Sequence, residues 1–209
     1  MSTYPAEPID PETMHARQRE RRDEIVRAAL RSLGSDEYEN IKIAKVAQNA
    51  DVALATVYRY FSSKEHLFAE AVLVWQGALR RKIEKARTHP DSEEEAVRDL
   101  MHRHIRAFEV QPQFLRAIVQ LSSSGDPYAR RALNELRGES AKILETMIGR
   151  DLDDELAAIY YTVTAVLDSS LREWLSGRFT IEQVYRQVDA SIGLIYRPKP
   201  GRVAESHSH

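Results

Sequence analysis

The sequence contains no cysteine, which excludes disulfide bonds and metal sites built on thiolates. No stretch approaches 18 consecutive apolar residues, so no membrane-spanning helix is expected. The N-terminal stretch "MSTYPAEPIDPETM" has neither early basic residues nor the apolar segment of a secretory signal peptide. Together these absences predict a soluble protein of the cytoplasm.

Patterns typical of β-strands are also nearly absent, because apolar residues recur every three or four positions along the chain. With 209 residues and 43% hydrophobic composition, the chain can bury a substantial core. We therefore predict an all-α fold. Its helices, about nine in number, are expected at residues 17–33, 43–50, 54–60, 63–87, 93–110, 113–121, 128–148, 154–176 and 181–196.

Two of the expected helices begin with a capping box, in which a hydroxyl and a side chain three residues later satisfy the first backbone amides. Ser62 and Glu65 form the first box, and Thr180 and Gln183 form the second. These boxes predict that helices start at residues 63 and 181.

Basic residues gather near the N-terminus, although the net charge of the whole chain is −2. Between His15 and Lys64 there are ten arginines and lysines against seven aspartates and glutamates. A basic N-terminal third on an acidic body is typical of a small DNA-binding module. The alternative, that the arginines only solvate the start of a helix, fits the charge pattern equally well.

The expected helices at 43–50 and 54–60 are each about two turns long and are joined by the tight turn "ADVA" (50–53). This arrangement is typical of a helix-turn-helix, here at about 43–61. Helices this short are not stable alone and need a buried seam. Within "ATVYRYFSSKEHL" (55–67), Val57 and Phe61 lie at core spacing. The side chains between them are therefore expected on the outside.

Those outward side chains suit contact with DNA. Thr56 can meet a base edge or a thymine methyl group in the major groove. Tyr58, Tyr60 and Lys64 can reach phosphates, and a phosphate would offset the unfavourable helix dipole at Lys64. Arg59 can reach either the groove or solvent. The alternatives are that the tyrosines form a surface between helices and that Lys64 is simply solvated.

The stretch "VAQNADVALATVYRYFSSKEHL" (46–67) resembles the DNA-binding motif of the TetR family of transcriptional repressors, within a wider similarity from about Arg19 to Leu79. The resemblance implies a homodimeric repressor, a pseudo-palindromic DNA operator, release by a small apolar effector, and no cofactor. It implies a DNA-binding domain at 17–79, an effector-binding and dimerisation domain at 80–196, and disordered tails at 1–16 and 197–209. Residues at the family's DNA-contacting positions are Leu54, Ala55 and Thr56 for bases, Tyr58, Tyr60 and Lys64 for phosphates, Arg59 beside them, Lys42 and Lys45 for further backbone contacts, and Arg17, Arg19, Arg21 and Arg22 for a basic arm.

The motif departs from the family at two positions. Asp51 stands where the family usually has a glycine in the turn, and aspartate tolerates the left-handed conformation better than most residues. Ala53 stands where a serine or threonine usually caps the next helix, a loss of roughly 1 kcal/mol unless Asp51 caps it instead. Because Leu54 and Ala55 offer no hydrogen bonds, base reading is expected to rest on apolar contacts, Thr56 and DNA shape.

The expected helix at 154–176 is apolar over more than half its circumference, which predicts burial on two sides. One side can pack on its own domain and the other on a second subunit, and the alternative is a large core within one chain. The family resemblance implies a four-helix dimer interface. Its candidate residues are Ile159, Val163, Val166, Ser170, Trp174, Val184, Val188, Ile192 and Ile195.

The resemblance also places an effector pocket among the fourth to eighth helices. Asp168 is either an i,i+4 partner of Arg172 or a hydrogen-bonding group of this pocket. The histidines of "MHRHI" (101–105) point to different helix faces, so no metal site is predicted. The candidate effector-binding residues are Trp75, Leu79, His104, Phe108, Phe114, Ile118, Leu121, Tyr128, Tyr160, Tyr161, Thr164 and Asp168.

No nucleophile elbow, phosphate loop or metal-ligand spacing occurs, so the protein is not expected to be an enzyme. Two alternative functions remain: a helical enzyme or small-molecule-binding protein that has kept the fold, and a DNA binder without an effector. "ADVALATVYRYFSSKEHL" and "LREWLSG" further resemble the actinobacterial cholesterol-catabolism repressors of the family, which implies a large lipophilic or acyl-CoA-type effector. The operator, the effector, the regulated genes and the sign of regulation do not follow from the sequence.

Overall fold

A computed structural model describes residues 7–85 and 90–197, so the outer parts of both predicted tails lie outside the described residues. Within these ranges the chain is helical and contains no strand, which confirms the all-α prediction. The elements are η1 (Pro11–Thr13), α1 (Ala16–Ser35), η2 (Tyr38–Asn40), α2 (Ile43–Asn49), α3 (Leu54–Tyr60), α4 (Lys64–Lys85), α5 (Glu93–Val110), α6 (Pro112–Leu121), α7 (Pro127–Ile148), α8 (Asp154–Leu175) and α9 (Ile181–Ile195).

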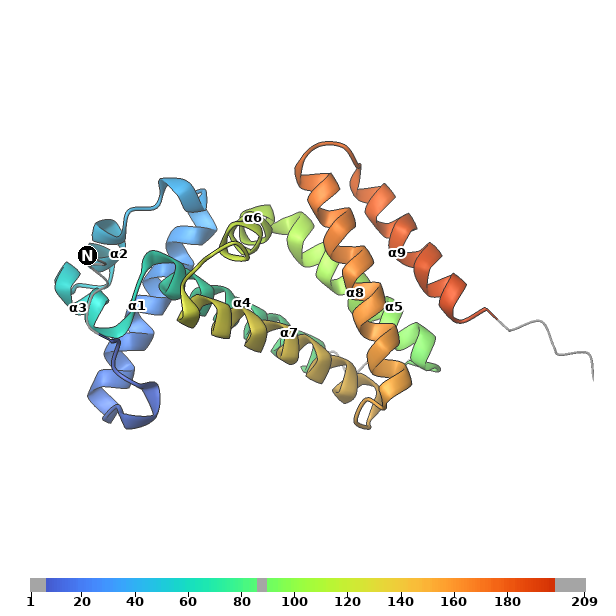
Figure 1. Ribbon diagram of the computed structural model, residues 1–209, viewed down its shortest axis with the longest axis horizontal. Coiled ribbons are helices and arrows are strands. Elements are labelled where there is room, and N and C mark those ends of the chain that lie inside the picture. Colours follow the sequence, from blue (N-terminus) through green and yellow to red (C-terminus); the bar gives the residue numbers. More distant parts are fainter. Residues whose placement is uncertain (1–6, 86–89, 198–209) are drawn as a thin grey trace, which may run out of the picture.

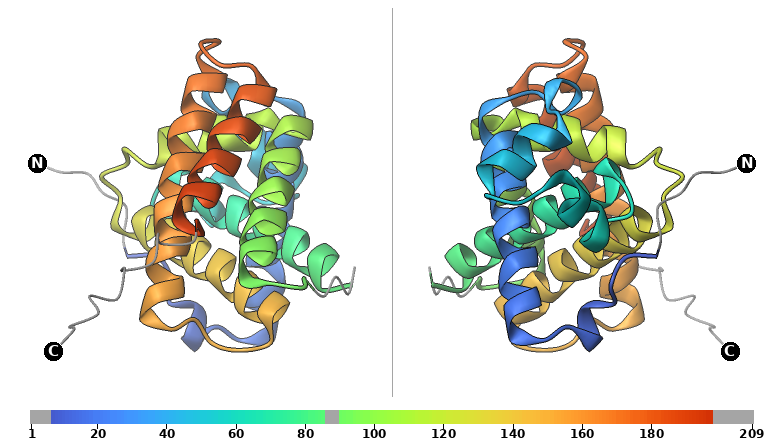
Figure 2. Two further views of the ribbon diagram at one scale, coloured as in Figure 1. Left: turned by 90° about the vertical axis from the view of Figure 1, so that its right-hand side faces the viewer. Right: turned by 90° about the vertical axis from the view of Figure 1, so that its left-hand side faces the viewer.

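The molecule is elongated, with two ends joined by a pair of long helices (Figure 1). Helices α1, α2 and α3 form one end, and α5, α8 and α9 form the other. Helices α4 and α7 run side by side from the first end toward the second, and α6 lies between the ends. The two ends are seen face-on in Figure 2, where α1 to α3 lie in front on the right and α5, α8 and α9 on the left. None of the helices among the described residues is long and apolar enough to cross a membrane.

The short helices α2 and α3 are held by a buried seam against α1. Val46 of α2, Val57 of α3 and Phe61 just after α3 are almost fully buried, as are Ile25 and Leu33 of α1. Fully burying one such side chain stabilises the fold by about 1.5–3 kcal/mol, which helices of two turns cannot supply alone. The sequence pattern therefore placed Val57 and Phe61 correctly in the core.

Helix α4 starts one residue later than the predicted capping box requires. The Ser63 hydroxyl accepts a hydrogen bond from the His66 amide at 3.0 Å, so Ser63 rather than Ser62 caps the helix. Ser62 instead donates its hydroxyl proton to Asp126 Oδ2 at 2.7 Å, a partner 64 residues away. Either of the two adjacent serines could cap α4 by sequence alone. The contact between Ser62 and Asp126 leaves Ser63 as the N-cap. The second capping box, Thr180 with Gln183, is confirmed at the start of α9.

Residues 7–15 pack against the helix-turn-helix end, so the tail predicted for residues 1–16 is wrong for this stretch. Met14 is fully buried in the core, and Ile9 packs against the same cluster. The Ile9 amide donates to the carbonyl oxygen of Arg59 at 3.1 Å, which joins the segment to the end of α3. The apolar residues of this segment are scattered among prolines and acidic residues. They form no periodic pattern, so the sequence did not predict this packing.

The two hydrophobic clusters of the chain do not separate at the predicted boundary of residue 79. Helix α4 contributes to both clusters, with Phe68 in the first and Ile83 in the second. The first cluster also includes Phe114 of α6 and Leu133 of α7. The helix-turn-helix end and the larger helical end therefore share α4, α6 and α7 as common walls.

Five predicted dimer-interface residues are buried inside the single chain, so they are not available to a partner. The single-chain core was the alternative to the interface, and it is the correct interpretation for Val163, Ser170, Val184, Val188 and Ile192. These positions face the seam between α8, α9 and α5. The other four, Ile159, Val166, Trp174 and Ile195, are half-buried.

Candidate DNA-binding surface and ligand cavity

The turn that leads into α3 contains the left-handed backbone conformation that we expected at Asp51, where the TetR family usually has glycine. Asp51 has φ +53°, the only positive φ at a non-glycine among the described residues. Its side chain forms no hydrogen bond to the start of α3, and Ala53 at the N-cap has none to offer. The turn therefore survives with aspartate, but α3 begins without a side-chain cap.

The exposed face of α3 carries five of the thirteen side chains predicted to contact DNA. Leu54 is 43% exposed and Tyr58 is 37% exposed. Ala55 and Arg59 are also exposed, and Thr56 is half-buried. The face is short, and it combines two aliphatic side chains, one hydroxyl, one phenol and one guanidinium. It can meet thymine methyl groups and phosphates, while Thr56 and Arg59 are its hydrogen-bonding candidates for base edges.

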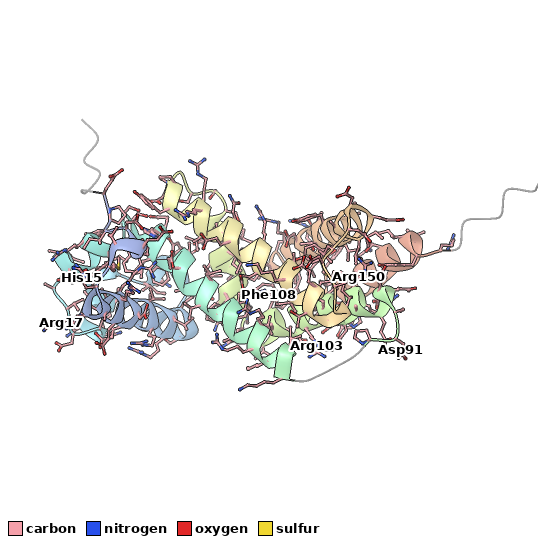
Figure 3. All side chains as sticks on the ribbon, turned by 90° about the horizontal axis from the view of Figure 1, so that it is seen from below. His15, Arg17, Asp91, Arg103, Phe108 and Arg150 are labelled. Atoms are coloured by element: carbon pink, nitrogen blue, oxygen red, sulfur yellow. The ribbon has the colours of Figure 1, made fainter. Side chains whose placement is uncertain are left out.

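Lysines and arginines surround this face at the same end of the molecule. Lys42 and Lys45 are exposed at the start of α2, and Lys45 Nζ donates to Gln48 Oε1 at 3.1 Å. Arg17 is exposed at the start of α1, and Figure 3 labels it at the same end of the molecule as His15. Arg19 is also exposed, although its Nε donates to a backbone carbonyl at 2.8 Å.

The rest of the predicted arginine arm is held within the domain. Arg21 forms an ion pair with Glu24 at 3.3 Å, one turn further along α1. Arg22 contacts Glu70 Oε2 at 2.8 Å, and its guanidinium lies over the Phe61 ring at 5.2 Å. The arm prediction is therefore wrong for Arg22, because the side chain crosses to α4 instead of reaching outward.

Tyr60 and Lys64 are also less available than predicted. Tyr60 is only 6% exposed and belongs to the core, because it lies one turn after Val57. Lys64 Nζ donates to the carbonyl oxygen of Tyr38 at 2.6 Å and lies over the Tyr38 ring at 4.3 Å. Burial lowers the pKa of Lys64, while Glu65 and Glu39 act in the opposite direction. The carbonyl oxygen and the ring of Tyr38 therefore stabilise the Lys64 ammonium group at the start of α4 without a DNA phosphate.

A cavity of about 240 Å³ lies at the larger helical end, where α4, α5, α6, α7 and α8 supply its lining. Seven of the twelve predicted effector residues line it: His104, Phe108, Ile118, Tyr160, Tyr161, Thr164 and Asp168. Figure 3 labels Phe108, which lies near the middle of the molecule. The cavity is therefore at the place that the family resemblance implied, and most of its wall is apolar.

The other five predicted effector residues lie outside the cavity lining. Trp75 stacks on Phe114 at 4.8 Å between ring centroids, and Phe114 and Leu121 are buried in the first hydrophobic cluster. Tyr128 stacks on a histidine of α4 at the start of α7, and Leu79 packs in the second cluster. Aromatic and aliphatic residues at helical spacing face either core or cavity, and spacing alone does not separate the two.

Sequence reasoning missed five of the ten polar residues that line the cavity. Gln76 and Ser140 line its inner part, and Arg137 and Arg172 line its exposed part. Only Gln76 carried a usable signal, a polar residue between the apolar positions of α4. Arginines on α7 and α8 resemble any other charged residues of a solvated helix face.

The exposed end of the cavity carries both signs of charge. Arg137 of α7 and Arg172 of α8 lie there with Asp168, and no ion pair within 4 Å joins Asp168 to either arginine. The Asp168 side chain keeps accessible surface at this opening, yet burial among the cavity walls raises its pKa, while Arg172 and Arg137 oppose that shift. The i,i+4 alternative for Asp168 and Arg172 is therefore not realised as a direct contact. The opening has an excess of positive charge.

The described residues contain no group of three side chains suited to hold a metal ion. His102 Nε2 lies 2.9 Å from Asp189 Oδ1 on the outer side of α5, and His104 points into the interior. The two histidines thus lie on different faces, as their spacing predicted.

Comparison with known proteins identifies the helix-turn-helix end. The profile of the family described as "Bacterial regulatory proteins, tetR family" matches residues 25–71. The HTH-type transcriptional repressor KstR of Mycolicibacterium smegmatis is 27% identical over 85% of this chain and 88% of its own length. A TetR transcriptional regulator from Rhodococcus sp. RHA1 has the same fold, with a TM-score of 0.76 at 21% identity over 87% of this chain and 98% of its own.

A further structure of this fold is a repressor that was crystallised with a ligand. Thermus thermophilus FadR, in complex with lauroyl-CoA, has a TM-score of 0.63 at 18% identity, covering 86% of this chain and 98% of its own. At this identity the similarity concerns the fold. The helix-turn-helix end therefore matches the TetR-family profile, and the chain as a whole is similar in sequence and fold to TetR-family transcriptional repressors, among them KstR.

Proposed function

We propose that the protein acts as a homodimer that binds a pseudo-palindromic DNA operator and is released by a small apolar effector. The observation that carries this proposal is the presence, in one chain, of an exposed recognition face on α3 and an apolar cavity that shares α4, α6 and α7 with the same end. A cytoplasmic location and the absence of catalysis belong to the proposal.

The dimer face that we propose is the outer side of α8 and α9, which Figure 2 shows at the end opposite α3. Small residues are exposed there on α8, and Leu194 of α9 is 65% exposed. The exposed α8 positions outside the cavity lining include Ala158, Thr162 and Ser169, which share one helix face. Small side chains allow the helices of two subunits to approach closely. In such a dimer, the two α3 helices would lie in successive major grooves of the operator, about 34–36 Å apart.

The cavity supports an effector with an apolar body and an anionic group. Its walls are mostly aliphatic and aromatic, and Arg137 and Arg172 stand at the opening. The lauroyl-CoA complex of a protein with this fold is one example of such a ligand in such an architecture. An effector that binds the DNA-free conformer more tightly than the DNA-bound one would lower DNA affinity by shifting the population.

The test begins with selection of bound sequences from random DNA, followed by titration of the recovered duplex with and without lauroyl-CoA. We expect a two-fold symmetric motif, binding by a dimer, and weaker binding when the ligand is present. A monomer at micromolar concentration, or binding without sequence preference, would contradict the repressor mechanism. Unchanged DNA binding with saturating ligand would favour a DNA binder without an effector.

A small-molecule-binding protein without operator binding is the second candidate, favoured by the cavity alone. It predicts ligand binding in calorimetry but no enrichment of any DNA sequence in the selection. Turnover of the ligand would extend that candidate to an enzyme that has kept the fold.

A further inference from the structure

The inner end of the cavity is polar, although most of its wall is not. Gln76 is 2% exposed and His104 is 7% exposed, and both line the cavity with Ser140, Tyr160 and Thr164. These five side chains come from α4, α5, α7 and α8. Buried polar groups lower stability unless they form hydrogen bonds, so each of them has to be accounted for.

The hydrogen bonds around His104 define which nitrogen of its ring carries the proton and how the Gln76 amide is oriented. His104 Nδ1 lies 2.9 Å from the carbonyl oxygen of Leu100, which can only accept, so Nδ1 carries the proton. Burial lowers the pKa of His104, so the ring is neutral and Nε2 is an acceptor. Gln76 Nε2 lies 3.1 Å from that atom and donates to it, which sets the orientation of the amide. The second amide proton goes to Ser140 Oγ at 2.7 Å.

This arrangement leaves hydrogen-bonding capacity of both kinds at the inner end. Gln76 has used both donors, and its Oε1 acceptor has no partner among the described residues. The Thr164 hydroxyl is buried without a partner in hydrogen-bond geometry, although Tyr160 lies close to it. Burial raises the pKa of Tyr160 to about 12, so its hydroxyl keeps its proton and can donate. One acceptor and two hydroxyl groups therefore border the same space.

We propose that the ligand of this cavity carries a hydroxyl group at its buried end, which donates to Gln76 Oε1 and accepts from Tyr160 or Thr164. Its apolar body fills the cavity, and its anionic group lies at Arg137 and Arg172; the inference rests on the apolar-effector part of the proposed function. A carbonyl oxygen would leave Gln76 Oε1 unpaired, and a methyl group would pair with neither Gln76 Oε1 nor the Thr164 hydroxyl. Each buried unpaired group lowers affinity by a factor of about ten or more.

The test uses three probes of equal chain length: 12-hydroxydodecanoate, 12-oxododecanoate and dodecanoate. Calorimetry on the full chain is expected to give binding of the hydroxyl probe about tenfold or more tighter than binding of dodecanoate, with the oxo probe between them. Dodecanoate that binds as tightly as the hydroxyl probe would overturn this inference and leave the proposed function intact. Binding of none of the three would overturn the inference together with the apolar-effector part of the proposed function.

Two variants separate recognition of the hydroxyl from a merely structural role. Gln76→Met keeps the length of the side chain and removes the acceptor, so the ratio between the hydroxyl and dodecanoate affinities should fall toward one. Thr164→Val removes a hydroxyl at constant shape and should reduce the same ratio even if Gln76→Met folds poorly. Gln120→Met, on α6 outside the cavity lining, is the matched control and should keep the wild-type ratio. An unchanged ratio in both cavity variants would overturn the assignment.

Discussion

The two ends of this molecule place their polar side chains in opposite surroundings. At the α3 end, Tyr58, Arg59 and Lys45 project from short helices into solvent, and the apolar seam lies behind them. At the cavity end, Gln76 and His104 lie inside, and apolar residues surround them.

Because of this difference, substitutions of polar residues are expected to change mainly binding at the α3 end, and both stability and binding at the cavity end. An exposed charge is well hydrated and contributes little to the fold, so its removal mainly changes what the surface binds. A buried polar group has to be satisfied by specific partners, so its removal alters both the fold and the cavity.

Phe61→Ala should have the largest effect, because it empties the centre of the seam that holds α2 and α3 to α1. Phe61 is fully buried and contacts Arg22 and His66, and such a truncation lowers the free energy of unfolding by about 3–5 kcal/mol. Urea unfolding would measure it. Leu54→Ala on the exposed side of α3 is the control, with an expected change within about 0.5 kcal/mol. Similar losses in both variants would show that the two faces of α3 are not distinct.

Arg59→Ala should change DNA binding without unfolding the domain, because the side chain is exposed at the last turn of α3. We expect a loss of about tenfold in affinity for the selected operator, and a salt dependence shallower by about one counterion. Fluorescence anisotropy at several salt concentrations would measure both. Arg131→Ala on the outer face of α7 is the matched control and should bind as the wild type does. If the control loses as much, the effect comes from overall charge and not from α3.

His104→Gln should flatten the dependence of stability on pH. The pKa of His104 is lowered by burial in the folded protein, while in the unfolded chain it lies near 6.5. The unfolded state therefore binds more protons as the pH falls through that range, and wild-type stability is lost from about pH 7 toward pH 5. Thermal unfolding at several pH values would compare the two proteins. Parallel profiles would mean that His104 is not the buried neutral group described above.

Ala53→Ser should raise stability slightly, because it supplies the missing N-cap of α3. Ala53 has the extended backbone of an N-cap, with φ −66° and ψ 147°, and the gain expected from a serine there is about 1 kcal/mol. Urea unfolding is again suitable. Ala55→Ser, inside the same helix, is the control and should give no gain. An equal gain in both variants would argue against capping as the cause.

The sequence predicted the helix-turn-helix end more closely than the cavity end, for a physical reason. The bounds of α3 follow from a tight turn and from two core positions within seven residues, so local spacing is sufficient. The bond between Ser62 and Asp126 joins residues 64 positions apart, and the packing of Met14 has no periodic neighbours. Neither this hydrogen bond nor the burial of Met14 can be predicted from the neighbouring residues in the sequence.

At the cavity end, the sequence predicted which positions are apolar but not what they face. Phe108 and Phe114 both lie on apolar helix faces, yet only Phe108 lines the cavity. Likewise Val163 and Ile159 were predicted for one dimer surface, and Val163 is buried within the chain.

The all-α class, the helix periodicity, the recognition motif and the core positions Val57 and Phe61 follow from the sequence, because they depend on contacts between near neighbours along the chain. The tertiary structure alone decided that Arg22 and Lys64 are bound within the domain, and that Gln76, His104 and Ser140 meet at one end of a cavity. Those outcomes depend on how α4 approaches α1, η2, α5 and α7. The distances between packed helices result from the whole core and not from any single segment.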